Sequence, residues 1–233
     1  MKNHKAPATD ALAFLETWDW YRALPPELRT LTRETATART AEPGDYIARV
    51  GEPSLHWYGV IRGYLQMYVA GPDGAQTTLY CLREGEWGGD GSLLKQELRQ
   101  YDLRSLTAAH ICLIPAATFE TLRHASIAFN HFLCGIMNAR MGEFVGMLAA
   151  ARLGGPETQV ARALLMLAGG AGEAVRELPI SQHELALISG LSRQRVNMAI
   201  SVFTRRGIVR SAVRKGCLQV QVPLLRDYVV SAN

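Results

Sequence analysis

Short runs in which apolar and polar residues alternate fill the chain between residues 46 and 114, and this period of two predicts β-strands. The runs cover residues 46–50, 57–61, 64–69, 77–82, 103–108 and 111–114. Turn sequences separate them, such as EPGD, GPDG and GGDG. Strands bounded by turns about every 8–12 residues indicate an all-β sandwich or barrel rather than a parallel sheet with crossover helices.

Helical periodicity borders this β-segment on both sides. Residues 9–32 predict two short helices, the second of which opens at Pro25-Pro26. After the last strand we expect a short helix over 116–123 and then a long helix over 127–153. A helix of this length would extend about 40 Å, which is more than the width of a small domain.

The long helix carries a stripe of mostly apolar residues whose positions are separated alternately by four and three residues. Its members are Leu133, Met137, Arg140, Phe144, Met147 and Ala151. So much apolar surface on one helix predicts that part of it packs on the β-segment and part pairs with a second copy of the chain. A plain core helix within a monomer is the alternative. Gly154-Gly155-Pro156 ends the helix and is interpreted as a hinge-like linker.

Residues 178–209 predict two short helices on either side of a turn at Gly190. Ser181 can cap the first helix, with Glu184 three residues later in a capping-box arrangement, and Ser192 can cap the second helix. The apolar positions of the second helix recur at helical spacing and are Val196, Ala199, Ile200 and Phe203. This pattern is typical of a helix-turn-helix.

The other face of the second helix begins with Arg193, Gln194, Arg195 and Asn197. These side chains can donate hydrogen bonds to guanine, adenine and phosphate. Because a helix dipole favours acidic groups in the first turn, the arginines there conflict with it, and an external polyanion would resolve the conflict. An αα-corner in an ordinary helical domain is the alternative to a DNA-binding motif.

Positive charge is concentrated at the C-terminal end of the chain. From Pro179 onward there are eight Lys and Arg against two Asp and Glu, whereas the preceding residues carry 17 and 19, and these balances of +6 and −2 reproduce the net charge of +4. A cationic segment of this kind is typical of a domain that binds phosphate groups. Runs at 209–211 and 218–222 flank the basic turn Arg214-Lys215-Gly216 and predict the hairpin of a winged helix.

The bulk properties narrow the class of protein. With 233 residues, 48% hydrophobic and 20% charged, the chain can hold two globular domains. No apolar run approaches the roughly 20 residues of a membrane span, and the N-terminus lacks a signal peptide's apolar core, so we expect a cytoplasmic protein with no membrane partner. The four cysteines are scattered and are expected to be reduced, mostly buried thiols. The six histidines show no metal-ligand spacing, so neither a metal site nor a catalytic site is predicted.

With these motifs the chain resembles the Crp-Fnr family of bacterial transcription regulators over nearly its full length. The resemblance rests on EPGDYI, YGVIRGYLQMY and EGEWGGDGSLL in the β-segment, and on ISQHELALISGLSRQRVNMAI followed by RRGIV near the C-terminus. It implies an α+β protein in three parts. These are a cyclic-nucleotide-binding-like β jelly roll that acts as a sensor (1–126), a long dimerisation helix (127–153) and a winged helix-turn-helix DNA-binding domain (154–233).

The resemblance also implies which residues meet DNA. They are Ser181, Gln182, Ser192, Arg193, Gln194, Arg195 and Asn197. Arg193 is expected to bond a guanine, whereas Arg195 is expected to contact phosphate and to position the protein without reading sequence. Met198 stands where several relatives have a second base-reading arginine, so a relative's operator sequence does not transfer to this chain.

The sensor motif matches less well. Cyclic-nucleotide binders of this family use a Gly-Glu pair for the ribose and, about ten residues on, Arg-Ser or Arg-Thr for the cyclic phosphate. Gly89-Asp90 and Arg99-Gln100 fall at these two positions of the effector pocket. Asp is one methylene shorter than Glu, and Gln lacks the compact hydroxyl. We therefore predict no cofactor and a pocket for a different small effector or for none, with a cyclic nucleotide as the alternative.

The predicted function is a sequence-specific transcription regulator, not an enzyme, that binds double-stranded DNA as a homodimer on a pseudo-palindromic operator. The resemblance implies RNA polymerase as a further partner. One alternative is a regulator that truly responds to cyclic nucleotides. The alternative from another class is a cupin-like metal enzyme, for which the barrel offers only two histidines, His56 and His110.

Overall fold

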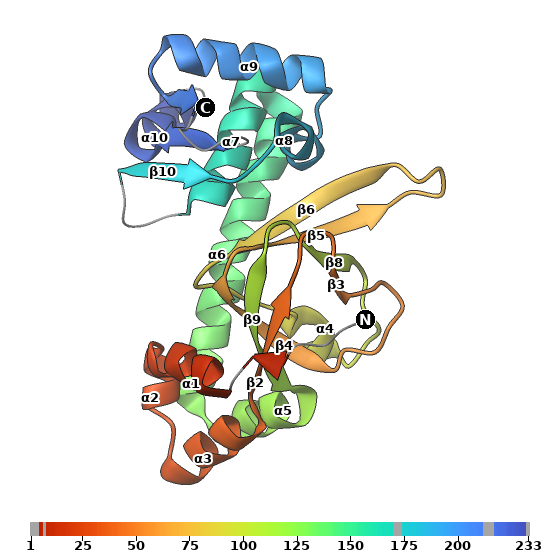
Figure 1. The fold of residues 1–233 in the computed structure, drawn as a ribbon, viewed down its shortest axis with the longest axis vertical. Coiled ribbons are helices and arrows are strands. Elements are labelled where there is room, and N and C mark those ends of the chain that lie inside the picture. Colours follow the sequence, from red (N-terminus) through yellow and green to blue (C-terminus); the bar gives the residue numbers. More distant parts are fainter. Residues whose placement is uncertain (1–4, 7, 170–173, 212–216, 232–233) are drawn as a thin grey trace. The chain divides into compact units, whose positions relative to one another are not determined.

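The computed structural model describes residues 5–6, 8–169, 174–211 and 217–231. They form two units. Residues up to 67 together with 82–139 make up the first unit, and residues 68–81 together with those from 140 onward make up the second. The order of elements, a β-segment followed by a long helix and then a helix-turn-helix, confirms the predicted α+β organisation (Figure 1).

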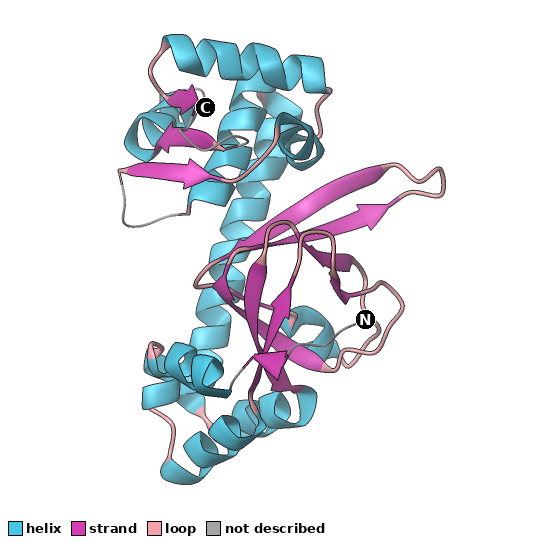
Figure 2. Cartoon of the chain, viewed as in Figure 1, coloured by secondary structure: helices cyan, strands magenta, loops and turns pink. Residues whose placement is uncertain are grey.

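Two sheets are formed by the β-segment (Figure 2). The first has the order β1-β2-β9-β4-β7, made of Lys5–Ala6, Thr37–Ala41, Ala109–Pro115, His56–Arg62 and Trp87–Gly88. The second has the order β3-β8-β5-β6, made of Tyr46–Ala48, Asp102–Ser105, Tyr64–Ala70 and Gln76–Arg83. Because β9 lies between β2 and β4, strands far apart in sequence are neighbours, as in a jelly roll. Strand β2 is absent from the predicted runs because its sequence, TARTA, buries only alanines.

Helices precede and interrupt these strands. They are α1 (Ala8–Glu16), α2 (Asp19–Arg22), α3 (Pro26–Thr35), α4 (Asp90–Lys95) and α5 (Ala116–Ala125). Helix α3 begins at the predicted Pro25-Pro26. Helix α4 replaces part of the turn predicted at GGDG, because Gly89 adopts φ 89° as the N-cap and Asp90 supplies an acidic group in the first turn.

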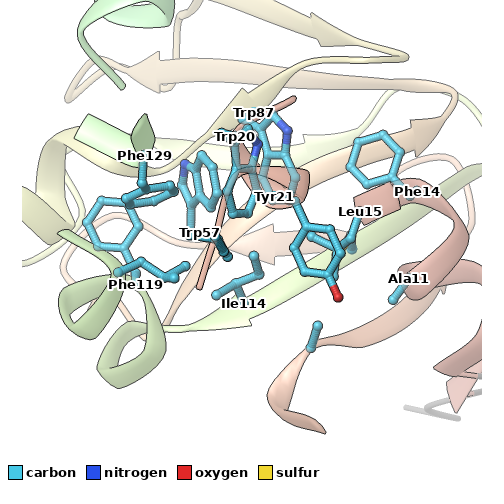
Figure 3. Close-up of a cluster of buried hydrophobic side chains, with 14 of the residues drawn as sticks. Ala11, Phe14, Leu15, Trp20, Tyr21, Trp57, Trp87, Ile114, Phe119 and Phe129 are labelled. Atoms are coloured by element: carbon cyan, nitrogen blue, oxygen red, sulfur yellow. The ribbon is translucent and has the colours of Figure 1, made fainter. Parts of the chain in front are cut away.

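Aromatic side chains form the centre of the first unit (Figure 3). Trp57 of β4 stacks on Trp87 of β7 with ring centroids 3.9 Å apart. Trp20 of α2 lies against both rings, at 5.7 and 5.8 Å. Phe129, from the first turn of the long helix, meets the Trp57 ring edge-on at 5.3 Å. The N-terminal helices, the sheet and the long helix therefore share one apolar core.

Helix α6 spans Ile127–Leu153, the predicted range, and one member of its predicted dimer stripe is buried. Leu133 is only 3% exposed and packs in the aromatic core. The Arg140 guanidinium lies over the Tyr80 ring at 5.3 Å, and Phe144 meets the same ring edge-on at 5.7 Å. Leu133 therefore lies in the chain's own core, whereas Arg140 and Phe144 are half-buried and their predicted place in a dimer interface stays a prediction.

Apart from Ile127 and Leu153 at its ends, the apolar side chains larger than alanine that α6 exposes lie mostly one position beyond the predicted members. They are Cys134, Met137, Met141, Val145 and Leu148, which we call the α6 stripe. Their spacings of three, four, four and three place them on one face of the helix. Of the other predicted members, Met147 is half-buried and Ala151 is exposed. The helix is apolar on two faces, and periodicity in the sequence does not tell which face meets the protein's own core.

The second unit is built on three helices that pack together: α7 (Pro156–Ala168), α8 (Gln182–Ser189) and α9 (Arg193–Arg205) (Figure 1). Its sheet has the order β10-β12-β11, made of Val175–Leu178, Leu218–Gln221 and Val209–Ser211. The two strands of the predicted wing are thus confirmed, while β10 and the helix α10 (Val222–Ser231) were not predicted. The basic turn Arg214-Lys215-Gly216 lies outside the described residues.

Gly154 lies at the tight corner between α6 and α7. A Cβ at this position would lie 2.9 Å from the Ala150 carbonyl oxygen and 2.9 Å from Thr158 Cβ. Pro156 then takes the first turn of α7, where its missing N–H costs nothing. Packing alone accounts for Gly154, and the hinge predicted at 154–156 stays a prediction. The two units divide elsewhere along α6, between Ala139 and Arg140.

Gly59→Ala tests how closely the aromatic core is packed. A Cβ at Gly59 would lie 2.5 Å from a ring carbon of Phe14 and 2.9 Å from one of Trp87. Overpacking of this kind typically costs about 1–3 kcal/mol, and we expect that loss in the free energy of unfolding. Urea titration followed by tryptophan fluorescence measures it.

Gly91→Ala in α4 is the matched control, because nothing lies within 4 Å of the added Cβ. Its free energy of unfolding should stay the same or rise slightly, since alanine is favoured over glycine in a helix. Equal losses at both positions would contradict the close packing around Gly59.

Candidate DNA interface

Helix α8 begins at the predicted capping box. The Ser181 hydroxyl accepts a hydrogen bond from the Glu184 N–H at 3.2 Å, and the Ser181 N–H donates to the Glu184 carboxylate at 2.7 Å. The helix ends at Gly190, which adopts φ 67° in the left-handed region. Local sequence therefore determines both ends of this helix and the turn that leads to the next one.

Helix α9 is capped by Ser192, whose hydroxyl accepts a hydrogen bond from the Arg195 N–H at 3.4 Å. Its buried side chains are those that the spacing predicted: Val196, Ala199, Ile200 and Phe203. The opposite face of α9 is therefore turned away from the packed helices and toward solvent.

The structure exposes the predicted DNA-contacting residues of α9 together. Arg193, Gln194, Arg195 and Asn197 are all exposed. Within the described part of the chain, neither Arg193 nor Arg195 lies within 4 Å of a carboxylate, so both guanidiniums keep their hydrogen-bond donors for an external acceptor.

The remaining predicted contacts lie at the starts of α8 and α9. Ser181 and Ser192 are exposed and Gln182 is half-buried. Although both serine oxygens accept cap bonds, each hydroxyl can still donate its proton to a phosphate oxygen. Helix N-termini also carry partial positive charge, which suits a phosphate.

The exposed residues of α9 that were not predicted as DNA contacts include two polar residues in line with Gln194, namely Ser201 and Arg205. Ser201 donates a hydrogen bond to the Asn197 carbonyl at 2.8 Å. Counting in steps of three and four from Gln194 places both residues on the outward face. This spacing could have identified Ser201 and Arg205 from the sequence as residues of the outward face.

The predicted effector residues only partly converge. Arg99 is buried, with 1% of its surface exposed, and its guanidinium donates to the carbonyl oxygens of Gly89 at 3.2 Å and His56 at 2.8 Å. It also donates to the Tyr58 hydroxyl at 2.8 Å. Gln100, in contrast, is exposed, and its amide donates to the Leu98 carbonyl at 2.9 Å. The structure thus joins Arg99 to Gly89 and turns Gln100 away.

The buried arginine affects its neighbours electrostatically. Burial, and then the positive charge of Arg99, lower the pKa of His56. Burial raises the pKa of Tyr58, although Arg99 opposes that shift. Both groups are therefore neutral near pH 7. Asp90 is buried as well, beside Gly89 at the start of α4.

A cavity of about 570 Å³ opens elsewhere in the first unit. Its lining includes Ser92, Leu93, Leu98 and Phe119, and none of the four predicted effector residues. Within the described ranges, no three His, Cys, Asp or Glu side chains group in a way that could hold a metal ion. None of the described helices is long and apolar enough to cross a membrane.

Comparison with protein-family models identifies both parts of the chain. Residues 38–126 match the cyclic nucleotide-binding domain, and residues 158–228 match the Crp-like helix-turn-helix domain. The second match contains α8 and α9 with their exposed polar residues. A comparison with curated proteins finds no match.

Solved structures share the fold. FixK2 from Bradyrhizobium japonicum superposes with a TM-score of 0.72 at 17% identity, over 82% of this chain and 96% of that one. A putative Crp/Fnr-family regulator from Eubacterium rectale gives 0.69 at 16% identity, over 92% and 99% of the chains. The c-di-GMP responsive global regulator CLP of Xanthomonas campestris gives 0.61 at 19% identity, over 80% and 94%.

The geometry of Arg99 predicts that the protein does not bind cyclic nucleotides. A cyclic phosphate would have to replace the acceptors that the guanidinium already has, and a hydrogen bond to a charged group contributes about 1.5–3 kcal/mol. Isothermal titration with cyclic AMP and with cyclic GMP should give no saturable heat. Saturable binding of either nucleotide would contradict this prediction, and its loss in folded Arg99→Gln protein would show that Arg99 binds the phosphate.

Proposed function

This chain belongs to the Crp-Fnr family of transcription regulators, which bind DNA, and we propose that it works as a homodimer that places the α9 helices of both protomers in successive major grooves of a pseudo-palindromic operator. The carrying observation is the exposed polar face of α9, whose first-turn arginines have no carboxylate partner among the described residues. Successive major grooves on one side of DNA lie about 34 Å apart.

The proposal divides the exposed residues by what they contact. Arg193, Gln194 and Asn197 read base edges, because their amide and guanidinium groups match the acceptors and donors of guanine and adenine in the major groove. Arg195, Ser181, Gln182 and Ser192 bind phosphates and set the orientation of the helix without reading sequence. The positions of Ser181 and Ser192 support this role, because both residues cap helix N-termini, where anions are favoured.

The α6 stripe forms the protomer contact in this proposal. Its apolar side chains leave the helix at coiled-coil spacing and are exposed, Met141 by 61%. Pairing two copies of the stripe about a twofold axis removes this surface from water and relates the two α9 helices by the same axis. The predicted residue Met137 belongs to the stripe, whereas Leu133 is excluded because it is buried.

The remaining parts of the proposal follow from the family. The protein acts in the cytoplasm, where the bacterial chromosome is, contacts RNA polymerase and has no catalytic role. An effector other than cyclic AMP or cyclic GMP would regulate it through the first unit. The relative CLP is described as responsive to c-di-GMP, so c-di-GMP is a reasonable first compound to test on this chain.

Arg193→Ala and Arg195→Ala separate base reading from phosphate binding. Arg193→Ala should relax sequence preference at one base position in each half-site. The discrimination against the wrong base that is lost there should be about 1–3 kcal/mol. Arg195→Ala should weaken all duplexes alike and reduce the slope of log affinity against log salt by about one unit per protomer. Binding to selected and scrambled duplexes across a salt series measures both effects. An altered sequence preference in Arg195→Ala would show that this contact is misassigned.

Met141→Glu tests the α6 stripe as the dimer interface. Two carboxylates facing each other across the twofold axis would be desolvated and would repel each other, so we expect monomers in sedimentation equilibrium and a large loss of operator affinity. Leu153→Glu is the control, since this residue is 90% exposed on the same helix but lies away from the stripe. A Met141→Glu protein that stays dimeric would place the interface elsewhere.

A further inference from the structure

One apolar residue interrupts the polar outward face of α9. Met198 is 62% exposed, whereas Val196, Ile200 and Phe203 are buried in the second unit and Val202 is half-buried. With 100° per residue, the positions opposite the buried face are Gln194, Met198, Ser201 and Arg205. Met198 therefore stands near the centre of the surface that the proposed function turns toward DNA.

Packing within the chain does not explain this position. The nearest positions on the same helix face, Gln194 and Ser201, are polar and exposed. Single exposed apolar residues are common on protein surfaces, so exposure alone carries no conclusion. Met198, however, lies at the centre of the helix face that the proposed function places in the major groove. Its exposed side chain would therefore contact a base edge.

The chemistry of methionine limits what it can recognise there. Its thioether has no hydrogen-bond donor and is only a weak acceptor, so it cannot bond the N7 and O6 acceptors of guanine or a phosphate oxygen. In the major groove, the apolar feature of unmodified base pairs is the C5-methyl group of thymine. A flexible, polarizable side chain packs well against such a group.

We propose that Met198 is a specificity-determining residue that selects thymine in each half-site by packing on its 5-methyl group. This inference rests on the proposed function, because it requires α9 in the major groove. Gln194 lies one helical turn before Met198, about 6 Å along the axis, and base pairs are about 3.4 Å apart. The selected thymine therefore lies within about two base pairs of the base that Gln194 contacts.

Replacing thymine by uracil in the operator tests this directly, because the exchange removes the methyl group and keeps every hydrogen-bonding group. The operator is the duplex that the full-length protein selects from random DNA. Each thymine is replaced in turn, in both half-sites, and affinity is measured by fluorescence anisotropy for the wild-type protein and for Met198→Ala.

At one thymine position per half-site, the wild-type protein should lose about 4-fold in affinity per methyl group, or about 15-fold for both half-sites, as expected from about 0.8 kcal/mol per buried CH₂-sized group. Met198→Ala should bind the thymine operator more weakly and should lose less than about 2-fold on the exchange to uracil, since the side chain that contacts the methyl is gone. Met198→Leu should retain most of the uracil penalty, because it remains apolar and of similar volume.

Ser201→Ala is the matched control on the same helix face and should keep the full wild-type penalty at that thymine. A uracil penalty that is the same in Met198→Ala as in the wild-type protein would overturn the inference, and so would a wild-type protein insensitive to uracil at every thymine. In both cases the operator is still bound, so the proposed function stands. Failure of the wild-type protein to select any duplex would instead contradict the proposed function and this inference with it.

Discussion

Four side chains on one face of α9, Val196, Ala199, Ile200 and Phe203, hold this helix against the second unit and thereby decide which residues it presents to solvent. Burying an apolar side chain of Val, Ile or Phe size contributes about 1.5–3 kcal/mol. A positive charge in the first turn of a helix opposes the dipole by about 0.3–1 kcal/mol. The packing therefore outweighs the conflict created by Arg193 and Arg195, and the fold can keep both guanidiniums at the position where the proposed DNA contact would resolve that conflict.

In the first unit, in contrast to the exposed arginines of α9, an arginine is buried and hydrogen-bonded within the protein. The resemblance to the Crp-Fnr family predicts Arg99 at the cyclic-phosphate position, but its guanidinium is buried and donates hydrogen bonds to the carbonyl oxygens of Gly89 and His56. The positive charge is satisfied within the protein, and the neighbouring His56 is held neutral. The Arg99 guanidinium thus serves as a structural contact within the first unit. The cavity beside Leu93 and Phe119 is a separate feature of the same unit.

Local patterns in the sequence predicted the features that depend on neighbouring residues. The capping box of Ser181 and Glu184, the turn at Gly190 and the range of α6 all follow from spacing and side-chain chemistry within a few turns of helix. The register of the α6 stripe could not be predicted in this way, because it depends on Trp20, Trp57 and other residues far away in sequence that bury the neighbouring face. Helix α10 and strand β10 were missed for the same reason, since their pairing and packing partners are distant in the chain. The roles of the exposed residues on α9 stay proposals, because a base or a phosphate must be present to distinguish them.

Selection of bound sequences from random double-stranded DNA by the full-length protein tests the central claim most directly, because it examines DNA recognition and twofold symmetry together. The account predicts an enriched inverted repeat whose two half-sites have centres about one helical turn apart, 10–10.5 base pairs or so. No enrichment at low salt, or enrichment of a single unrepeated half-site, would contradict it.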